Sequence, residues 1–360
     1  MNKSVLIIGS GIGGLATALR LLSKGYNVKV YEKEKTIGGK TNQLVHHPFT
    51  FDLTASILMN REIYEEVFHD ANLYYKNYIE FIKVDPIYRS FYPDETLYDF
   101  TRDLVSLIKT LESISTEDAI GYMKFLSEVY ERYTIANDHF LQQSFENPID
   151  FFKPTSLINA LKTKAFSTSH QLISKYIQDE KLQKFLCYQS LYVGVSPYEG
   201  PSIYTLVPVI SQLYGLWHLK GGIYSYVKAL KKAIYQLGGV IETNYVVDEI
   251  IISGDKAIGV KSKEKESVFA DIIISNADCP YTMDTLLKSD IHKKKYTTSK
   301  LDTLKYTCST FIIYLGLKKK YPQLSVHNLY LNDDFKKNID SAFTGHLPIN
   351  PSFYIYCLPK

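Results

Sequence analysis

The start of the chain combines two apolar runs with one amphipathic segment between them. The first run extends from Val5 to Ile8, the second ends at Glu32, and apolar residues recur between them at three- and four-residue spacing. This pattern predicts a strand, a helix and a second strand. Gly25 follows the helical pattern directly, and glycine commonly ends a helix at such a place. A βαβ unit is therefore predicted at the start of the chain.

Helical periodicity dominates the next part of the chain, from about Arg61 to Tyr192. Apolar residues recur there at three- and four-residue spacing, and turn-like stretches such as "YPDET" and "GVSPYEGPS" separate the segments. The pattern indicates an inserted helical region rather than a continuation of the βαβ unit. The predicted helices cover residues 62–71, 103–114, 117–141 and 172–192.

The pattern changes again at Gly221, where an amphipathic helix is predicted up to the pair Gly238-Gly239. Short strand-like runs follow it and fit the remainder of the first sheet, so that domain is split in sequence. They cover residues 240–243, 246–252, 257–262 and 270–278. Three later runs look like strands of a second domain. They cover residues 310–317, 326–331 and 352–358.

Composition limits the class of protein. A chain of 360 residues that is 45% hydrophobic can bury a sizeable core, most simply as two domains. A net charge of +3 is too small to predict binding to nucleic acid. The cysteines are too widely spaced for a zinc site or a disulfide framework, and several histidines lack neighbouring ligands, so no metal site is predicted. These residues are Cys187, Cys279, Cys308, Cys357, His46, His47, His218 and His327.

Candidate chemistry begins at the first turn of the βαβ unit, which reads Gly9-x-Gly11-x-x-Gly14. Gly9 allows a sharp turn, Gly11 allows backbone to approach a pyrophosphate, and Gly14 allows the helix to pack on the strand. The helix N-terminus would face the phosphates. Glu32 ends the second strand, where it can accept hydrogen bonds from a ribose diol and would repel a 2′-phosphate. NADP is therefore disfavoured, while NAD and FAD both fit.

A second glycine pair follows the acidic residue closely, in Gly38-Gly39-Lys40. This pattern resembles the extension found in glutathione-reductase-like and amine-oxidase-like FAD proteins. In those proteins the second pair lets another loop approach the flavin diphosphate, and the basic residue adds positive charge there. FAD is therefore the predicted cofactor.

Longer stretches resemble the bacterial carotenoid desaturase family over the whole chain. They include "GGKTNQL", "FTFDL", "LYVGVSPYEGPSIYTLVPVI", "GLWHLKGGIYSYVKAL" and "ADIIISNAD". The resemblance implies an α/β fold with a Rossmann-like FAD-binding domain of the glutathione-reductase/amine-oxidase type and an inserted α+β substrate domain. We expect the FAD-binding domain at residues 1–58 and 215–280, and the substrate domain at residues 59–214 and 281–360.

The implied activity is FAD-dependent desaturation of a C30 carotenoid precursor, from 4,4′-diapophytoene to 4,4′-diaponeurosporene, by hydride transfer to flavin. Two alternatives stay open: a 4,4′-diaponeurosporene oxygenase, and a truncated, non-catalytic nucleotide- or lipid-binding remnant. The resemblance identifies no catalytic acid or base. The residues expected to bind the cofactor are Gly9, Ser10, Gly11, Ile12, Gly13, Gly14, Glu32, Lys33, Gly38, Gly39, Lys40, Asp52, Val247 and Asn276.

Residues 201–219 contain no Asp, Glu, Lys or Arg over 19 positions. That length approaches the ~20 residues that a helix needs to span a bilayer, but Pro208 and Gly215 interrupt it. Three interpretations stay open: a buried helix that lines the substrate site, a membrane-facing entrance, and a transmembrane helix. The first two suit an enzyme that takes a long apolar polyene from lipid.

The expected location is the cytoplasm, with peripheral attachment to the inner face of the cell membrane, because no signal peptide precedes the first strand. A homo-oligomer is left open. Two departures from the family are visible. Thr54-Ala55 stands where the family usually has Gly-Pro, and members of the family continue beyond "FYIYCLPK", so the chain is expected to lack the C-terminal part.

Overall fold

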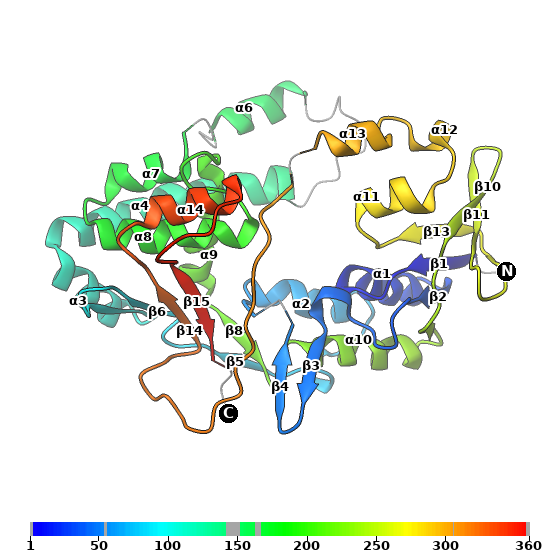
Figure 1. The fold of residues 1–360 in the computed structure, drawn as a ribbon, viewed down its shortest axis with the longest axis horizontal. Coiled ribbons are helices and arrows are strands. Elements are labelled where there is room, and N and C mark those ends of the chain that lie inside the picture. The colour runs from blue at the N-terminus through cyan, green and yellow to red at the C-terminus, as the bar shows by residue number, and fades with distance from the viewer. Residues whose placement is uncertain (1–2, 54–55, 142–151, 163–166, 305, 358–360) are drawn as a thin grey trace. The chain divides into compact units, whose positions relative to one another are not determined.

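The computed structural model describes residues 3–53, 56–141, 152–162, 167–304 and 306–357 (Figure 1). The chain divides into two compact units, each assembled from segments that are distant in sequence. Unit 1 contains Met1–Ile82, Trp217–Tyr306 and Tyr314–Gly316, and unit 2 contains Lys83–Leu216, Thr307–Ile313 and Leu317–Lys360. The domain limits expected from the sequence stay a prediction.

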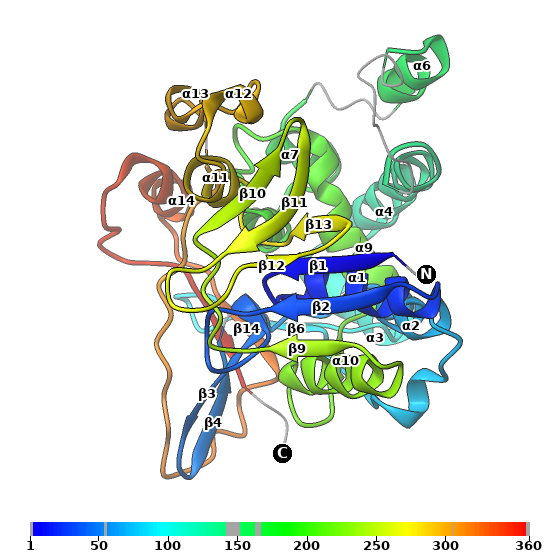
Figure 2. The ribbon, with the colours of Figure 1, turned by 90° about the vertical axis from the view of Figure 1, so that its right-hand side faces the viewer.

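Unit 1 is built on a four-stranded parallel sheet with the order β13-β1-β2-β9 (Figure 2). The predicted βαβ unit is β1, α1 and β2, and the runs predicted at 240–243 and 270–278 supply β9 and β13. The sheet and the helices beside it have these bounds: β1 Ser4–Ile8, α1 Ile12–Ser23, β2 Asn27–Tyr31, α2 Arg61–His69, α10 Tyr224–Gln236, β9 Val240–Glu242 and β13 Ile272–Ser275.

Alternate side chains of β1 enter two different hydrophobic cores, as the two-residue period of a strand requires. Val5 and Ile7 are buried in a core with residues of α1, α2 and α10. Leu6 and Ile8 are buried in a second core with residues of a three-stranded antiparallel sheet. The sheet of β1 is therefore covered on both faces, and its covering sheet consists of β10 Glu249–Ser253, β11 Lys256–Lys261 and β12 Val268–Phe269.

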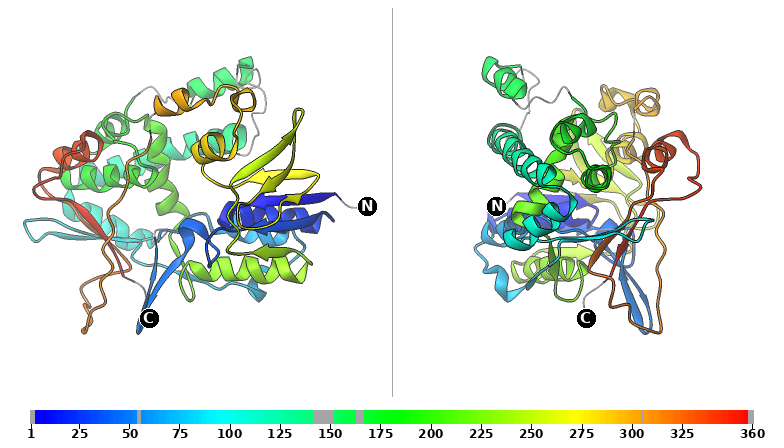
Figure 3. Two further views of the ribbon diagram at one scale, coloured as in Figure 1. Left: turned by 45° about the vertical axis from the view of Figure 1, so that its right-hand side comes forward. Right: turned by 90° about the vertical axis from the view of Figure 1, so that its left-hand side faces the viewer.

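This covering sheet corrects one expectation. The runs at 246–252 and 257–262 do not continue the parallel sheet, because β10 and β11 pair with each other in antiparallel register. Only two residues, Gly254 and Asp255, separate Ser253 from its partner Lys256, and Gly254 has a φ of +58°. A two-residue turn can join only antiparallel strands. Figure 3 shows the resulting hairpin.

The remaining elements of unit 1 are short. β3 and β4 form a hairpin, and β5 pairs with β8. Their bounds are η1 Gly39–Thr41, β3 Gln43–His46, β4 Phe49–Asp52, η2 Tyr75–Asn77, β5 Phe81–Lys83, β8 Trp217–Leu219, α11 Cys279–Tyr281, η6 Thr282–Leu286, α12 Asp290–Lys293 and α13 Thr298–Asp302.

Unit 2 is largely helical, as the periodicity between residues 61 and 192 predicts. Its helices are α3 Leu104–Ile114, α4 Thr116–Ala136, η3 Asn137–Leu141, α6 Pro154–Lys162, α7 Ser169–Tyr176, α8 Glu180–Tyr188, η4 Gln189–Val193, η5 Ser202–Thr205, α9 Leu206–Tyr214 and α14 Phe335–Thr344. The charge-free stretch 201–219 forms η5, α9 and β8 in place of one long helix. Every helix among the described residues is too short or too polar to span a lipid bilayer.

A four-stranded sheet, with the order β15-β14-β6-β7, completes unit 2. Its strands are β6 Tyr88–Phe91, β7 Leu97–Phe100, β14 His327–Tyr330 and β15 Phe353–Tyr356. The runs at 326–331 and 352–358 contain β14 and β15, whereas the pattern missed β6 and β7. The strand predicted at 310–317 is wrong. Residues 306–317 form no backbone hydrogen bond with another described residue, and a strand exists only when it has a partner.

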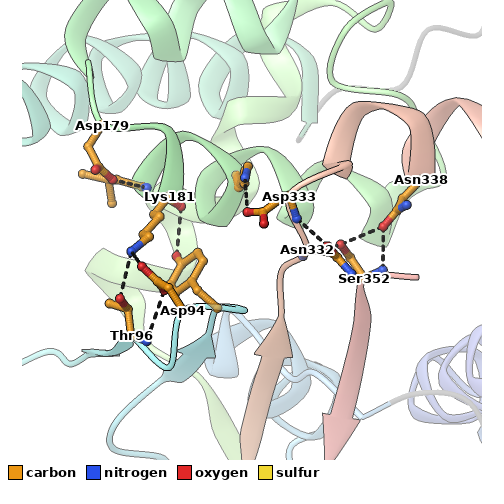
Figure 4. A network of polar contacts seen from close by, with 11 residues as sticks. Asp94, Thr96, Asp179, Lys181, Asn332, Asp333, Asn338 and Ser352 are labelled. Carbon is orange, nitrogen blue, oxygen red and sulfur yellow. Dashed lines mark hydrogen bonds and ion pairs between the residues drawn. The ribbon is translucent and has the colours of Figure 1, made fainter. Parts of the chain in front are cut away.

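Polar contacts connect the helices of unit 2 to this sheet (Figure 4). Lys181, in the first turn of α8, forms an ion pair with Asp94 and donates to the hydroxyl of Thr96 at 2.8 Å, in the turn between β6 and β7. The hydroxyl of Ser352, next to β15, donates to Asn338 of α14 at 3.0 Å. These side-chain contacts with helices add to the backbone hydrogen bonds that hold the short strands of the sheet together.

The helix predicted at 172–192 is divided into α7 and α8 at Ile177. Asp118 of α4, which is 2% exposed, stabilises this division. Its two carboxylate oxygens accept the backbone N–H groups of Gln178 at 2.6 Å and Asp179 at 2.8 Å. Both donors would otherwise be left without an acceptor at a helix break.

Asp118→Ala is expected to lower the free energy of unfolding by about 3 kcal/mol, because two backbone donors lose a buried charged acceptor. Urea unfolding monitored by circular dichroism measures this change. Glu117→Ala is the matched control, since Glu117 is exposed in the same turn. Equal midpoints for the two variants would contradict the structural role of Asp118.

Candidate functional site

The carboxyl ends of three neighbouring strands meet at one edge of the parallel sheet. Ile8 of β1 is in register with Tyr31 of β2 and with Ser275 of β13. The residues that follow these strands are Gly9, Glu32 and Asn276, all of them predicted from the sequence. In open α/β sheets, ligands bind at this edge.

The glycine turn fits tightly between β1 and α1. Gly9 has a φ of +93°, a conformation that side chains disfavour, and its N–H donates to Tyr31 at 2.8 Å. A Cβ atom on Gly14 would overlap the carbonyl oxygen of Gly9. Gly14 therefore lets α1 begin directly against the turn.

The N-terminus of α1 has no side-chain cap and no nearby negative charge from its own first turn. Its N-cap, Gly11, provides no side-chain hydrogen bond, and no acidic residue lies in the first turn. The first backbone N–H groups of a helix have no acceptor within the helix and carry a partial positive charge. Ile12 and Gly13 begin this turn and contribute backbone rather than side-chain chemistry. A diphosphate is the kind of group that this turn can bind.

Glu32 is held in place by the same turn. It is 6% exposed, and its Oε2 atom accepts the N–H of Ser10 at 2.9 Å and the hydroxyl of Ser10 at 2.5 Å. Its Oε1 atom accepts the N–H of Glu34 at 3.0 Å. The glycine motif predicts that Ser10 lies in the cofactor turn, but no pattern in the sequence indicates that Ser10 orients Glu32.

The second glycine pair lies directly against the first motif. The N–H of Gly38 donates to the carbonyl of Ser10 at 3.0 Å, and Gly38 forms an isolated bridge with Gly11. A Cβ atom on Gly39 would lie 3.3 Å from the Cα atom of Gly11. Gly38 and Gly39 have φ values of +116° and +54°. The two motifs therefore form one continuous backbone surface.

Asn276 packs across the glycine turn. Its N–H donates to Ile8 at 2.8 Å. A Cβ atom on Gly13 would lie 2.6 Å from its Oδ1 atom, and one on Gly11 would lie 2.9 Å from its Nδ2 atom. Two glycines of the turn are thus required by a side chain that lies more than 250 positions away in the sequence.

The two predicted lysines lie in solvent. Lys40 forms an ion pair with Asp278 at 3.4 Å, and the two side chains are 81% and 73% exposed. Lys33 is 62% exposed, with Glu34 at 4.0 Å. Lys40 follows the glycine pair and Asp278 follows β13, so this ion pair lies between two of the segments that form the site.

Val247 has a buried side chain, 5% exposed, in the core under the covering sheet. No backbone hydrogen bond joins it to another residue in the described ranges. The chain just before it is anchored to the site, because the N–H of Tyr245 donates to the carbonyl of Glu32 at 2.9 Å. The expected contact of its backbone with the adenine stays a prediction.

Asp52 ends β4 and contacts α10. Its Oδ2 atom accepts the N–H of Ile223 at 3.2 Å. Burial raises the pKa of the Asp52 carboxyl, although the N–H groups of Ile223 and Tyr224 and the nearby His218 oppose the shift. Burial lowers the pKa of His218, which Asp52 in turn opposes. Thr54-Ala55, the departure noted after this residue, lies outside the described residues.

These residues fit a dinucleotide, with an acid for a ribose, an open helix N-terminus for a diphosphate and glycines where side chains would intrude. Within the described ranges, no group of three or more His, Cys, Asp and Glu residues could hold a metal ion. The described site also contains no evident catalytic acid or base. Its chemistry is that of cofactor binding.

Comparison with known proteins agrees with this geometry. Residues 12–309 match the family model described as flavin containing amine oxidoreductase. A solved oxidoreductase from Methanosarcina mazei superimposes with a TM-score of 0.53 at 20% identity, over 76% of this chain and 58% of that one. This likeness supports the predicted α/β fold. The family match confirms the predictions of a flavin cofactor and of an oxidoreductase.

Two curated relatives match nearly the whole chain. The 4,4′-diapophytoene desaturase (4,4′-diaponeurosporene-forming) of Staphylococcus haemolyticus is 35% identical over 98% of this chain and 71% of its own length. The protein of the same name from Staphylococcus aureus strain Newman is 36% identical over 98% of this chain and 70% of its own length. The chain therefore belongs to the flavin-containing amine oxidoreductase family and, within it, to the carotenoid desaturases.

Proposed function

We propose that this chain carries out FAD-dependent desaturation of a C30 carotenoid precursor, converting 4,4′-diapophytoene to 4,4′-diaponeurosporene. The observation that carries the proposal is the 35–36% identity, over 98% of the chain, to desaturases named for this product. Bound FAD would supply the acceptor for a hydride from an allylic CH–CH unit. The chain itself would bind and orient the two reactants.

In this proposal each part of the site holds one part of FAD. Glu32 accepts hydrogen bonds from the ribose hydroxyls, the first turn of α1 holds the diphosphate, and the Val247 backbone contacts the adenine. Gly38 and Gly39 allow the second loop to approach the diphosphate. Lys40 adds positive charge there when it leaves Asp278, because an exposed ion pair is weak and easily exchanged.

Asp278→Asn is expected to tighten FAD binding, because it removes a negative charge near the diphosphate that pairs with Lys40. An exposed ion pair contributes up to about 1 kcal/mol, so the expected gain is about twofold to fivefold in the dissociation constant. Quenching of flavin fluorescence measures it. Asp284→Asn is the control. Weaker binding by Asp278→Asn at low salt would contradict this role of the ion pair.

We propose that unit 2 holds the polyene. Supporting this, α9 belongs to the charge-free stretch and Leu206, Val207, Pro208 and Val209 are buried. A C30 hydrocarbon has almost nothing to hydrogen-bond, so apolar surface must supply its binding energy. This assignment follows the interpretation of residues 201–219 as a buried helix.

We propose that the protein lies in the cytoplasm, attached peripherally to the inner face of the cell membrane, and draws its substrate from lipid. Apolar side chains of unit 2 that face solvent support it: Leu104 and Val105 of α3 are 57% and 64% exposed, and Ile120 and Met123 of α4 are 53% and 40% exposed. Sedimentation with phospholipid vesicles tests this location. Loss of co-sedimentation in Ile120→Ser/Met123→Ser is the expected result, with Phe269→Ser, an exposed apolar residue of unit 1, as control.

The activity is tested by incubating the purified chain anaerobically with FAD, 4,4′-diapophytoene in liposomes and an artificial electron acceptor. A three-peaked polyene band in the visible spectrum is expected. Product formation that required oxygen would favour an oxygenase. A flat spectrum with stoichiometric flavin bound would leave a cofactor-binding remnant and contradict the proposed function.

A further inference from the structure

Asp52 acts on a helix that begins far from it in the chain. The N-cap position of α10 is Ile223, which has no side chain able to accept a hydrogen bond. Asp52 supplies the acceptor instead, through the 3.2 Å bond that its Oδ2 atom accepts from the N–H of Ile223. A carboxylate at a helix N-terminus is favourable for the unpaired N–H groups and for the helix dipole.

Gly222, which precedes Ile223, leaves room for the Asp52 carboxylate. Gly222 has a φ of +85°, and a Cβ atom there would lie 2.9 Å from Oδ1 and 3.1 Å from Oδ2 of Asp52. Only glycine combines this conformation with this close approach. On the other side, His218 is 6% exposed and interacts electrostatically with the Asp52 carboxyl.

The first turn of α10 contacts the loop that carries the second glycine pair. A Cβ atom on Gly38 would lie 3.2 Å from Cε2 of Tyr224 and 3.3 Å from Cγ1 of Val227. Val227 is fully buried, so the hydrophobic core, as well as the Asp52 cap, holds this part of α10 against Gly38. Gly38 in turn donates to Ser10 at 3.0 Å.

From these contacts we infer that Asp52 is a positioning residue of the cofactor site, which caps α10 and thereby holds Gly38 and Gly39 against Gly11. The inference rests on the proposed binding of FAD. It replaces the expectation that Asp52 contacts the cofactor itself. Removing the cap loosens the first turn of α10 at Tyr224, while the buried Val227 still holds the next part of the helix. The glycine loop thus loses part of its support and separates from the glycine turn more often.

Limited trypsin digestion tests this inference without any flavin. Lys40 lies directly after Gly39, and its side chain is already 81% exposed, so the order of the loop limits cleavage there. Asp52→Ala is expected to speed cleavage after Lys40 about tenfold, whereas Asp52→Asn retains an acceptor oxygen and should stay within about twofold of the wild type. The FAD dissociation constant is likewise expected to rise most in Asp52→Ala and to change little in Asp52→Asn.

Asp103→Ala provides the matched control, because Asp103 caps α3 of unit 2 through the N–H of Ser106. It should lower the unfolding midpoint without altering cleavage after Lys40. If Asp52→Ala behaves like Asp103→Ala, with an unchanged cleavage rate and FAD affinity, the inference is overturned. If the wild type binds no FAD, the proposed function fails separately, and the cleavage rates still decide the role of Asp52.

Discussion

Gly14→Val is expected to abolish FAD binding by this chain. A Cβ atom at this position overlaps the carbonyl oxygen of Gly9 and lies 3.1 Å from Nδ2 of Asn276. The backbone of the turn cannot yield without losing the bond from Gly9 to Tyr31, so α1 must move away from β1. Because the N-terminus of α1 is the proposed diphosphate site, we expect the dissociation constant to rise by about 100-fold or more.

Titration with FAD, followed by flavin fluorescence, measures this loss. Gly238→Ala is the control, because Gly238 lies in the same unit with a φ of +81° and nothing within 4 Å of an added Cβ atom. It tests the general cost of a side chain in the left-handed backbone conformation, about 1–2 kcal/mol. FAD affinity of Gly14→Val within threefold of the wild type would exclude the turn as the cofactor site.

Replacing Glu128 by alanine is expected to cost about 3–5 kcal/mol in the stability of unit 2, because a buried charge would lose its partner. Arg132 is 4% exposed. It forms an ion pair with Glu128 and donates to the hydroxyl of Ser202 at 3.1 Å. Glu128 also accepts hydrogen bonds from Lys175 at 3.2 Å and from Tyr176. Urea unfolding measures the loss, and the exposed Glu131 of the same helix provides the control, Glu131→Ala.

The pH dependence of stability gives an independent test of this ion pair. Burial alone would raise the pKa of Glu128, but hydrogen bonds from Tyr176, Arg132 and Lys175 outweigh it and lower the pKa from 4.5 to about 2. The carboxylate therefore stabilises the folded state fully above the unfolded-state pKa, and this stabilisation is lost as pH falls toward 2. Glu128→Gln should have a flatter stability profile below pH ~5 than the wild type. Parallel profiles would contradict the assignment.

The glycine motifs were readable from the sequence because consecutive residues encode the backbone conformation that the cofactor requires. Gly9, Gly11 and Gly14 set one turn, and their spacing within a βαβ pattern predicts its geometry. The contact of Asp52 with Ile223 joins residues 171 positions apart. No local pattern indicates such a pairing, so Asp52 could be given a place near the cofactor but not its structural partner.

The strands show a second limit of predicting structure from this sequence. The runs at 310–317 and 326–331 have the same apolar character, yet only the second forms a strand, because β6 and β15 are available to pair with it. β6 and β7 were missed because polar residues interrupt their apolar positions: Arg89 and Ser90 in β6, and Asp99 in β7. For a related reason, β10 and β11 were expected in the parallel sheet although they form the antiparallel sheet that covers it. Apolar runs predict where strands lie, but the connections between strands decide which of them pair.

A single-turnover experiment tests whether this chain passes hydride from the polyene precursor to bound FAD. The chain is loaded with FAD, mixed anaerobically with 4,4′-diapophytoene in liposomes without another acceptor, and followed in the near-ultraviolet for the polyene and in the visible region for the flavin. Flavin absorption is expected to bleach while polyene bands appear, with one flavin reduced for each double bond formed. Bound flavin that stays oxidised while the substrate remains unchanged would contradict this transfer of hydride.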